Sequence, residues 1–255
     1  MPLELVTVPC LKDNYAFLLH DPDSGRTALV DAPEAAPIRT ALAERGWKLS
    51  DILITHHHSD HVAEVDTFRS ESEARVWGAA ADAHRLPDLD VRVVPGDPLD
   101  FAGTRIEVMD VPGHTIGHIA YYVPEPGLLF SGDSLMALGC GRLFEGSPAQ
   151  MWDSLSRMAA LPDDTLVCSG HEYTQANARF ALSVEPNNSA LRDRAATVAA
   201  ARADGKATVP STLATEKATN PFLRAHSAEI RATIGMPSAQ DVDVFARVRQ
   251  MKDVF

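Results

Sequence analysis

This chain of 255 residues has few cysteines and no long apolar segment. Cys10, Cys140 and Cys168 are too few and too scattered to form the disulfide framework of a small secreted domain. No apolar run approaches the roughly 20 residues that span a bilayer, and the first residues lack a basic segment followed by an apolar one. We therefore expect a cytoplasmic protein without a membrane partner.

Positive charge is also scarce. Lysine and arginine total 23 against 35 acidic residues, which gives a formal net charge of −12. Binding to nucleic acid requires a basic footprint that matches the phosphates, so we expect no nucleic-acid partner. An anionic small substrate would need a local basic patch set against this acidic background.

The rest of the composition is that of an ordinary globular protein, with 45% hydrophobic and 23% charged residues. Up to about residue 170, short apolar runs alternate with helix-like segments, which favours two sheets packed face to face and flanked by helices. After residue 174 the sequence predicts helices and no clear strand. We expect one domain over 1–171 and a helical second domain over 172–255. The predicted helices are 35–45, 63–72, 148–161, 188–204, 227–234 and 239–251.

The most informative segment is THHHSDH at residues 55–61, directly after the apolar residues 52–54. Imidazole and carboxylate groups together suit zinc and similar divalent ions. In an extended segment His56 and His58 point the same way, and His57 points to the other side. The segment therefore predicts a metal site in which His57 takes no part.

Asp60 and His61 would open the following helix and point toward a second position nearby. The spacing thus predicts two adjacent metal ions rather than one. The alternative is a histidine-rich surface loop or the remnant of an expression tag. A tag would lie at a terminus and would not carry an aspartate in this register.

Further possible ligands follow other strand-like runs, each beside a glycine that permits a tight turn. They are His114 after residues 106–111, Asp133 after 128–130 and His171 after 166–168. Any one of these residues alone would more often be a capping aspartate or a core histidine. Four strand ends meeting at one edge would gather five histidines and two aspartates. That set is about what a pair of divalent ions needs.

These segments resemble the metallo-β-lactamase-fold hydrolases, in the strings THHHSDH, PGHTIGH, SGDSL and SGHEYT. Others are similar to glyoxalase II, the hydroxyacylglutathione hydrolase family: KDNYA, GCGR, EPNN, VPSTL, NPFLR and RVRQMKD. The resemblance runs from about residue 5 to the last residue. It implies an α+β fold, namely a metallo-β-lactamase-like αββα sandwich with a C-terminal helical domain. It also implies that residues 1–171 form the catalytic domain and residues 172–255 the substrate-binding domain.

The resemblance also implies two divalent metal ions, with zinc favoured and iron or manganese as alternatives. By residue-to-residue match, the first would be held by His56, His58 and His114, the second by Asp60, His61 and His171, and both by Asp133. Two bridged ions bring the pKa of a shared water toward neutrality. The resulting hydroxide would attack a carbonyl whose oxyanion the ions stabilise. Asp60 and Asp133 are accordingly the predicted catalytic carboxylates.

A thioester suits such a site, because a thiolate, with a pKa near ~8.5, leaves without a dedicated general acid. An ester or lactam would need a proton donor that the sequence does not identify. The family activity implied is hydrolysis of S-(2-hydroxyacyl)glutathione, typically S-D-lactoylglutathione, to glutathione and D-lactate. This reaction belongs to methylglyoxal detoxification. We expect a monomer.

For the glutathione portion, the resemblance implies contacts with Arg142, Phe144, Tyr173, Arg249 and Lys252. Two of these depart from the commoner family pattern, since Arg142 replaces a lysine and Phe144 a tyrosine. The arginine keeps the charge, whereas the phenylalanine lacks a hydroxyl. Without the resemblance, Arg249 and Lys252 would be assigned to a solvated helix face. His118 is expected in a turn or behind a ligand, and Tyr15 and Asn14 near the entrance.

Other functions remain open at this point. A persulfide dioxygenase would share the fold but use one iron, without need of Asp60, His61 and His171. A lactonase is disfavoured by the helical C-terminal region. A regulatory metal-binding module without turnover is a third alternative, although such a protein would be expected to have lost at least one ligand.

Overall fold

The computed structural model describes residues 2–255 and divides into two compact units. Unit 1 contains the described residues up to Asp110 and Gly117–Gly132, and unit 2 contains Val111–Ile116 and Asp133–Phe255. The domain boundary expected between residues 171 and 172 stays a prediction. No helix in the described part of the chain has both the length and the apolar character needed to cross a membrane.

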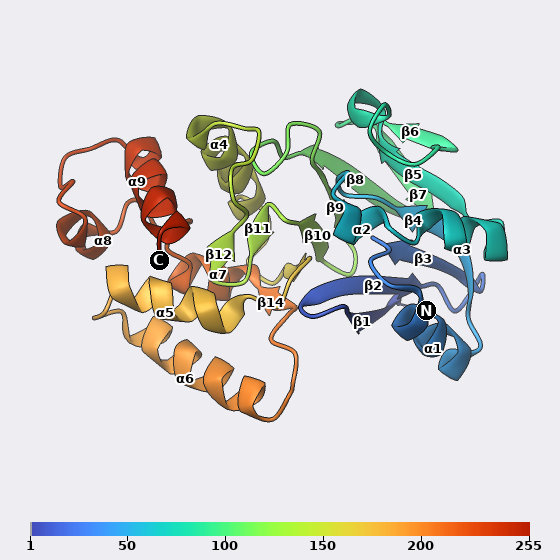
Figure 1. The fold of residues 1–255 in the computed structure, drawn as a ribbon, viewed down its shortest axis with the longest axis horizontal. Coiled ribbons are helices and arrows are strands. Elements are labelled where there is room, and N and C mark those ends of the chain that lie inside the picture. The colour runs from blue at the N-terminus through green and yellow to red at the C-terminus, as the bar shows by residue number, and fades with distance from the viewer. Residues whose placement is uncertain (1) are drawn as a thin grey trace. The chain divides into compact units, whose positions relative to one another are not determined.

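The first sheet of unit 1 has the strand order β1-β2-β3-β4-β5-β6 (Figure 1). Its strands are β1 (Glu4–Cys10), β2 (Asn14–His20), β3 (Arg26–Val30), β4 (Lys48–Leu53), β5 (Arg75–Ala79) and β6 (Val91–Val93). β1 to β3 run antiparallel, and β3 to β6 run parallel. Helices α1 (Ala35–Arg45) and α3 (Val65–Ser72) cover this sheet through a core that includes Ile38, Ile52 and Phe68.

The second sheet of unit 1 is an antiparallel meander. Its strands are β7 (Pro98–Phe101), β8 (Thr104–Asp110), β9 (Ile119–Val123) and β10 (Leu128–Gly132). The rings of Phe17 and Phe130 join the two sheets, with centroids 5.6 Å apart. The hydroxyl of Tyr121 donates to Ile54 O at 3.0 Å, and burial raises the pKa of this tyrosine. Face-to-face packing of two sheets, as predicted, therefore fixes the segment that leads from β4 to His56.

Two short helices complete unit 1, α2 (Ser59–Val62) and the 3-10 helix η1 (Ala80–Asp82). As predicted, Asp60 and His61 lie in the first turn after the histidine run, and His58 takes the N-cap position.

Unit 2 is mainly helical. Its elements are β11 (Leu135–Met136), β12 (Gly139–Cys140), α4 (Pro148–Ala159), β13 (Leu166–Ser169), α5 (Thr174–Val184), α6 (Ser189–Ala203), β14 (Ser211–Thr212), α7 (Leu213–Thr219), α8 (Ala228–Thr233) and α9 (Asp241–Asp253). The expectation of no strand after residue 174 is wrong at β14, which pairs with β13 through two residues. Pro210 and the N-cap Thr212 limit this strand to those two residues, too short to leave a period-two pattern.

Aromatic side chains hold the helices of unit 2 together. Phe222 lies 6.0 Å from Phe180 of α5 and 6.0 Å from Phe245 of α9, between ring centroids. Phe245 in turn contacts Trp152 of α4 at 5.8 Å. Helix α4 begins with a capping box between Ser147 and Gln150. Its position is thus fixed at its start and along its buried face.

Candidate metal centre

The first group of predicted ligands follows β4 in unit 1. His56 is almost fully buried, and its ligand nitrogen lies within 4.8 Å of those of His58 and His61. His57 instead has its Nδ1 3.2 Å from Asp82 Oδ2. This placement agrees with the prediction that His57 lies outside the ligand set.

Asp31, at the end of β3, is a residue that the sequence reasoning missed. Its Oδ2 lies 2.8 Å from His61 Nδ1 and accepts from Thr55 Oγ1 at 2.8 Å, and its Oδ1 accepts from Thr55 N at 2.9 Å. The backbone of Asp31 has φ 56, a left-handed conformation that is uncommon outside glycine. Asp31 therefore has a strained backbone, and its buried carboxylate orients the ring of His61 and the turn at Thr55 that carries His56. The pattern of an aspartate directly after an apolar strand could have identified it.

We expect Asp31→Ala to weaken metal binding about tenfold to a hundredfold, because the partner that fixes a ligating imidazole is lost. It should also lower the free energy of unfolding by about 1–3 kcal/mol, since buried donors lose their acceptor. Metal titration and denaturant unfolding of the same protein measure the two effects. Normal metal affinity in the variant would contradict the assignment.

The structure assigns contacts to two residues whose roles the sequence left open. The side-chain amide of Asn14 donates to Asp60 O at 3.0 Å and to Asp60 Oδ2 at 3.1 Å. Asn14 is buried and therefore holds the carboxylate rather than standing at an entrance. The His118 ring is fully buried and stacks on His56, with centroids 4.6 Å apart.

The second group of predicted ligands lies in unit 2. Asp133 Oδ2 lies 3.4 Å from His114 Nε2 and 3.2 Å from His171 Nε2. All three residues are at least nine-tenths buried. His114 Nδ1 donates to Arg142 O at 2.8 Å, which directs its Nε2 toward the carboxylate. One aspartate thus faces two imidazoles, as a carboxylate shared between two ions would.

Close backbone approach shapes this second group. A Cβ on Gly141 would lie 2.0 Å from Asp133 O and 2.9 Å from His114 Nδ1. A Cβ on Gly113 would lie 2.7 Å from the Cβ of Met151 in α4. Only glycine fits at either position, so the segments on both sides of His114 and Asp133 are packed without spare room.

The predicted glutathione contacts before α5 lie on the surface of unit 2. Arg142 has Nε 4.0 Å from Asp253 Oδ1, and Phe144 is 64% exposed. The ring of Tyr173 stacks on His171 with centroids 4.7 Å apart. Phe144 meets His114 edge-on at 5.2 Å. Each of these two rings therefore lies against a predicted metal ligand and leaves part of its surface open.

Arg249 and Lys252 lie on α9, but the first is not on a solvated face. Arg249 is 4% exposed; its guanidinium donates to Cys140 O at 2.8 Å and lies 3.0 Å from Asp253. Lys252 is partly buried over the ring of Phe180. Burial lowers the pKa of Lys252, and Arg249, Arg179 and Arg142 lower it further. Four cations therefore gather here in an acidic chain, and sequence reasoning missed Arg179.

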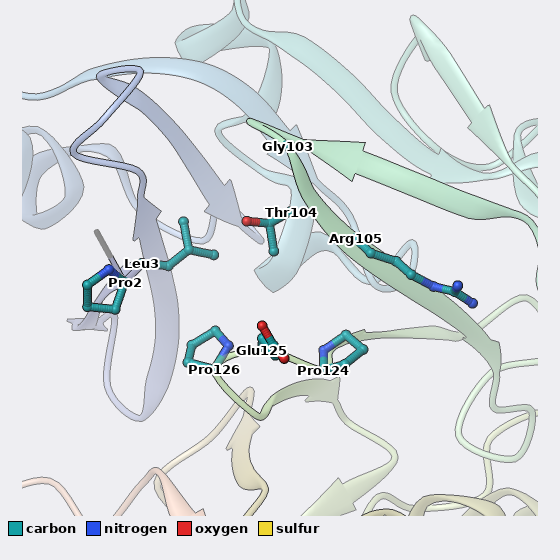
Figure 2. Close-up of a pocket in the computed structure, with 8 residues that line it drawn as sticks. All are labelled: Pro2, Leu3, Gly103, Thr104, Arg105, Pro124, Glu125 and Pro126. Atoms are coloured by element: carbon teal, nitrogen blue, oxygen red, sulfur yellow. The ribbon is translucent and has the colours of Figure 1, made fainter.

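Two hollows occur within single units. The hollow of about 480 Å³ in Figure 2 borders the β7–β8 and β9–β10 turns, and no predicted site residue lines it. The other, of about 610 Å³ in unit 2, is bordered by α9 and by Leu143, close to Arg142 in sequence. Of the predicted substrate contacts, Arg249 lines this second hollow.

Two family models cover nearly the whole chain. The metallo-beta-lactamase superfamily matches residues 13–171, and the hydroxyacylglutathione hydrolase C-terminus matches residues 172–255. A hydroxyacylglutathione hydrolase of Ruegeria pomeroyi is 61% identical over 100% of both chains. One from Cereibacter sphaeroides is 60% identical, also over 100% of both. The chain belongs to the hydroxyacylglutathione hydrolase family. The predicted membership of glyoxalase II is thereby confirmed, and with it the prediction of a hydrolase.

Solved structures agree on the fold. ETHE1 from Myxococcus xanthus is 24% identical with a TM-score of 0.67, over 100% of this chain and 99% of that one. A structure described as TTHA1623 in a di-iron-bound form is 25% identical with a TM-score of 0.60, over 86% and 100%. The predicted metallo-β-lactamase-like αββα sandwich with a C-terminal helical region is confirmed. Family and side chains together indicate a site for a divalent metal.

Proposed function

We propose that this hydroxyacylglutathione hydrolase family member cleaves the thioester of S-(2-hydroxyacyl)glutathione, S-D-lactoylglutathione above all. The products are glutathione and the 2-hydroxy acid, and the role is methylglyoxal detoxification. The observation that carries this proposal is the 56–61% identity to hydroxyacylglutathione hydrolases over at least 98% of both chains.

The proposed cofactor is a pair of divalent ions, with zinc favoured and iron or manganese as alternatives. The similar protein described in a di-iron-bound form supports a two-metal site and keeps iron in consideration. The proposed ligands are those of the sequence prediction: His56, His58 and His114, then Asp60, His61 and His171, with Asp133 shared.

The donor set fits such ions. Three of the imidazoles have Nδ1 at hydrogen-bonding distance from a protein oxygen: His56 from Thr55, His61 from Asp31 and His114 from Arg142. This arrangement fixes each ring and directs Nε2 to a metal, as is usual for ligating histidines. Imidazole and carboxylate donors without a cysteine among them suit zinc, iron and manganese alike.

Two residues, Asn14 and Asp31, position proposed metal ligands, and the ions would supply the chemistry. Divalent ions, when bound, lower the pKa of water and polarise a carbonyl. Asn14 holds the Asp60 carboxylate, and Asp31 holds His61 in one tautomer. The departing thiolate needs no protein proton donor, because its pKa lies near ~8.5.

The cation cluster of unit 2 supports binding of a glutathione carboxylate. Burial lowers the pKa of Lys252, and the nearby charges of Arg249, Arg179 and Arg142 lower it further, in a chain of net charge −12. Mutual repulsion between cations is relieved by an anion, and guanidinium groups bind carboxylates well. Phe144 and Tyr173 would supply apolar contact to the peptide. The loss of a hydroxyl at Phe144 is expected to affect affinity and not the reaction.

The deciding assay measures thiol release from S-D-lactoylglutathione, other thioesters and lactones, together with the metal content of the same sample. Hydrolysis of lactoylglutathione by a protein holding about two metals per chain is expected. If a metal-replete sample leaves this substrate intact but consumes oxygen with glutathione persulfide, the dioxygenase alternative is correct.

Lys252→Ala is expected to raise KM for lactoylglutathione about tenfold, if its contact contributes about 1.5 kcal/mol, and to leave kcat nearly unchanged. Because the pKa of Lys252 is lowered, KM of the parent should rise with pH below the range in which an ordinary lysine titrates. The matched control is Lys206→Ala, whose ammonium pairs with Asp204 on the surface. A small thioester without the peptide should respond to neither change. An unaltered KM would leave Lys252 as a helix-packing residue.

A cytoplasmic location and a monomeric state are also proposed. The proposal of a reducing compartment rests on the small number and wide spacing of the three cysteines, which are buried.

A further inference from the structure

The hairpin at residues 135–140 connects two parts of the proposed metal centre within unit 2. Its strands β11 and β12 pair Leu135 with Cys140, and Gly141 N donates to Ser134 O at 3.1 Å to extend the ladder. One end of the ladder leads to Asp133. The other leads to Arg142, whose carbonyl holds His114.

Three contacts thus close a ring of atoms. Asp133 is joined through the hairpin to Arg142, Arg142 O to His114 Nδ1, and His114 Nε2 to Asp133 Oδ2 at 3.4 Å. The distance between the carboxylate and the imidazole therefore depends on the conformation of the hairpin.

The conformation of the hairpin turn depends on contacts from outside the hairpin. Leu138 has φ 55, a left-handed conformation disfavoured for a branched side chain, and it is fully buried. Such a conformation persists where the surroundings impose it. Here the surroundings are polar side chains from the helices of unit 2.

Four buried side chains bind the backbone of this hairpin: Asn177 of α5, Glu216 of α7, Asn220 directly after α7, and Arg249 of α9. Asn177 Nδ2 donates to Ala137 O at 3.0 Å, and Glu216 Oε2 accepts from Leu138 N at 2.9 Å. Asn220 Nδ2 donates at 3.0 Å to each of Met136 O and Gly139 O. Arg249 donates to Cys140 O. We call this set the hairpin clamp.

The clamp is itself fixed. Glu216 is fully buried and pairs with Arg194 of α6. The Asn220 amide also donates to Glu216 at 3.1 Å, and its oxygen accepts from Phe222 N at 3.0 Å. A Cβ on Gly139 would lie 2.4 Å from Asn177 Nδ2, so the clamp and the turn fit without spare room.

We propose that the hairpin clamp positions Asp133 and His114 for metal binding, so that the helices of unit 2 set metal affinity as well as contact substrate. The inference rests on the proposed function, because it concerns the metal centre. It assigns Asn177, Glu216 and Asn220 as positioning residues that touch neither metal nor substrate. It also gives the string NPFLR a physical role.

The test compares two asparagines of unit 2. Asn220→Ala removes two hydrogen bonds to the hairpin. Asn188→Ala is the control, since its amide likewise donates to a carbonyl, Ala218 O, and a carboxylate, Glu185, while its oxygen accepts from Leu191 N. None of these partners belongs to the hairpin. Asn188 is the less buried of the two, so thermal unfolding is recorded for both.

Zinc affinity is measured by competition with a chelator, at a temperature where each variant is folded. We expect Asn220→Ala to weaken zinc binding about tenfold or more, and Asn188→Ala to stay within about twofold of the parent. If Asn220→Ala does not fold, Asn177→Ala, which removes one hydrogen bond to the hairpin, is judged by the same criterion. Equal zinc affinity in the clamp variant, the control and the parent would overturn the inference.

The parent protein is measured beside the variants, for zinc binding and for turnover of lactoylglutathione. Failure of the proposed function would show in the parent. If only the clamp inference fails, the parent still binds zinc and hydrolyses lactoylglutathione, and the variants show no difference in zinc affinity.

Discussion

Replacement of Asp133 by alanine is expected to abolish thioester hydrolysis and to weaken retention of both proposed metal ions. Asp133 Oδ2 lies 3.2 Å from His171 Nε2 and 3.4 Å from His114 Nε2, so one carboxylate faces a proposed ligand of each ion. Removing a shared carboxylate leaves the repulsion between the two cations uncompensated and deprives each ion of one ligand. Elemental analysis after gel filtration, together with thiol release from lactoylglutathione, measures both effects.

Asp21→Ala is the control for Asp133→Ala. Asp21 is 6% exposed, as is Asp133, and it accepts hydrogen bonds from Ser24 in a turn of unit 1. Its loss should lower stability without changing metal content. Asp133→Asn keeps the shape of the side chain and separates loss of charge from loss of packing. A metal-replete and active Asp133→Ala protein would rule out the shared-ligand role.

Local patterns in the sequence were enough to predict six of the helices, although α5 and α7 were missed. The helix expected at residues 35–45 is α1, and those at 148–161 and 188–204 match α4 and α6 to within about two residues. Their ends are specified nearby, by a left-handed glycine at Gly46 and by N-caps at Ser147 and Asn188. The alternation that turned His57 away from His56 and His58 is equally local.

The roles of Asn14 and Glu216 depend on long-range contacts. Asn14 reaches Asp60 across 46 positions, and Glu216 reaches Leu138 across 78. No period or spacing in the sequence reports such a contact. Arg249 was open to interpretation as a solvated helix residue for the same reason. Its guanidinium donates to Cys140 O, which lies 109 positions away.

A second large effect is expected at a glycine. Gly141→Ala should lower kcat/KM about a hundredfold or more and reduce metal content. The added Cβ would lie 2.0 Å from Asp133 O and 2.9 Å from His114 Nδ1. The first neighbour is backbone and cannot rotate away, so the segment between Cys140 and Arg142 must move. A displacement of about 1 Å at a catalytic group can cost about a hundredfold in rate.

Gly205→Ala separates this effect from the general cost of changing a glycine. Gly205 has φ +71 with nothing within 4 Å of an added Cβ, so its substitution is strained but meets no neighbour. It should cost about 1 kcal/mol of stability while leaving metal content and kcat/KM at the parent level. Gly141→Ala should instead affect metal content and kcat/KM more than stability, because its added Cβ displaces Asp133 and His114. Parental kinetics and metal content in Gly141→Ala would mean that the segment can yield without moving either ligand, and the close packing around Asp133 would then have no part in catalysis.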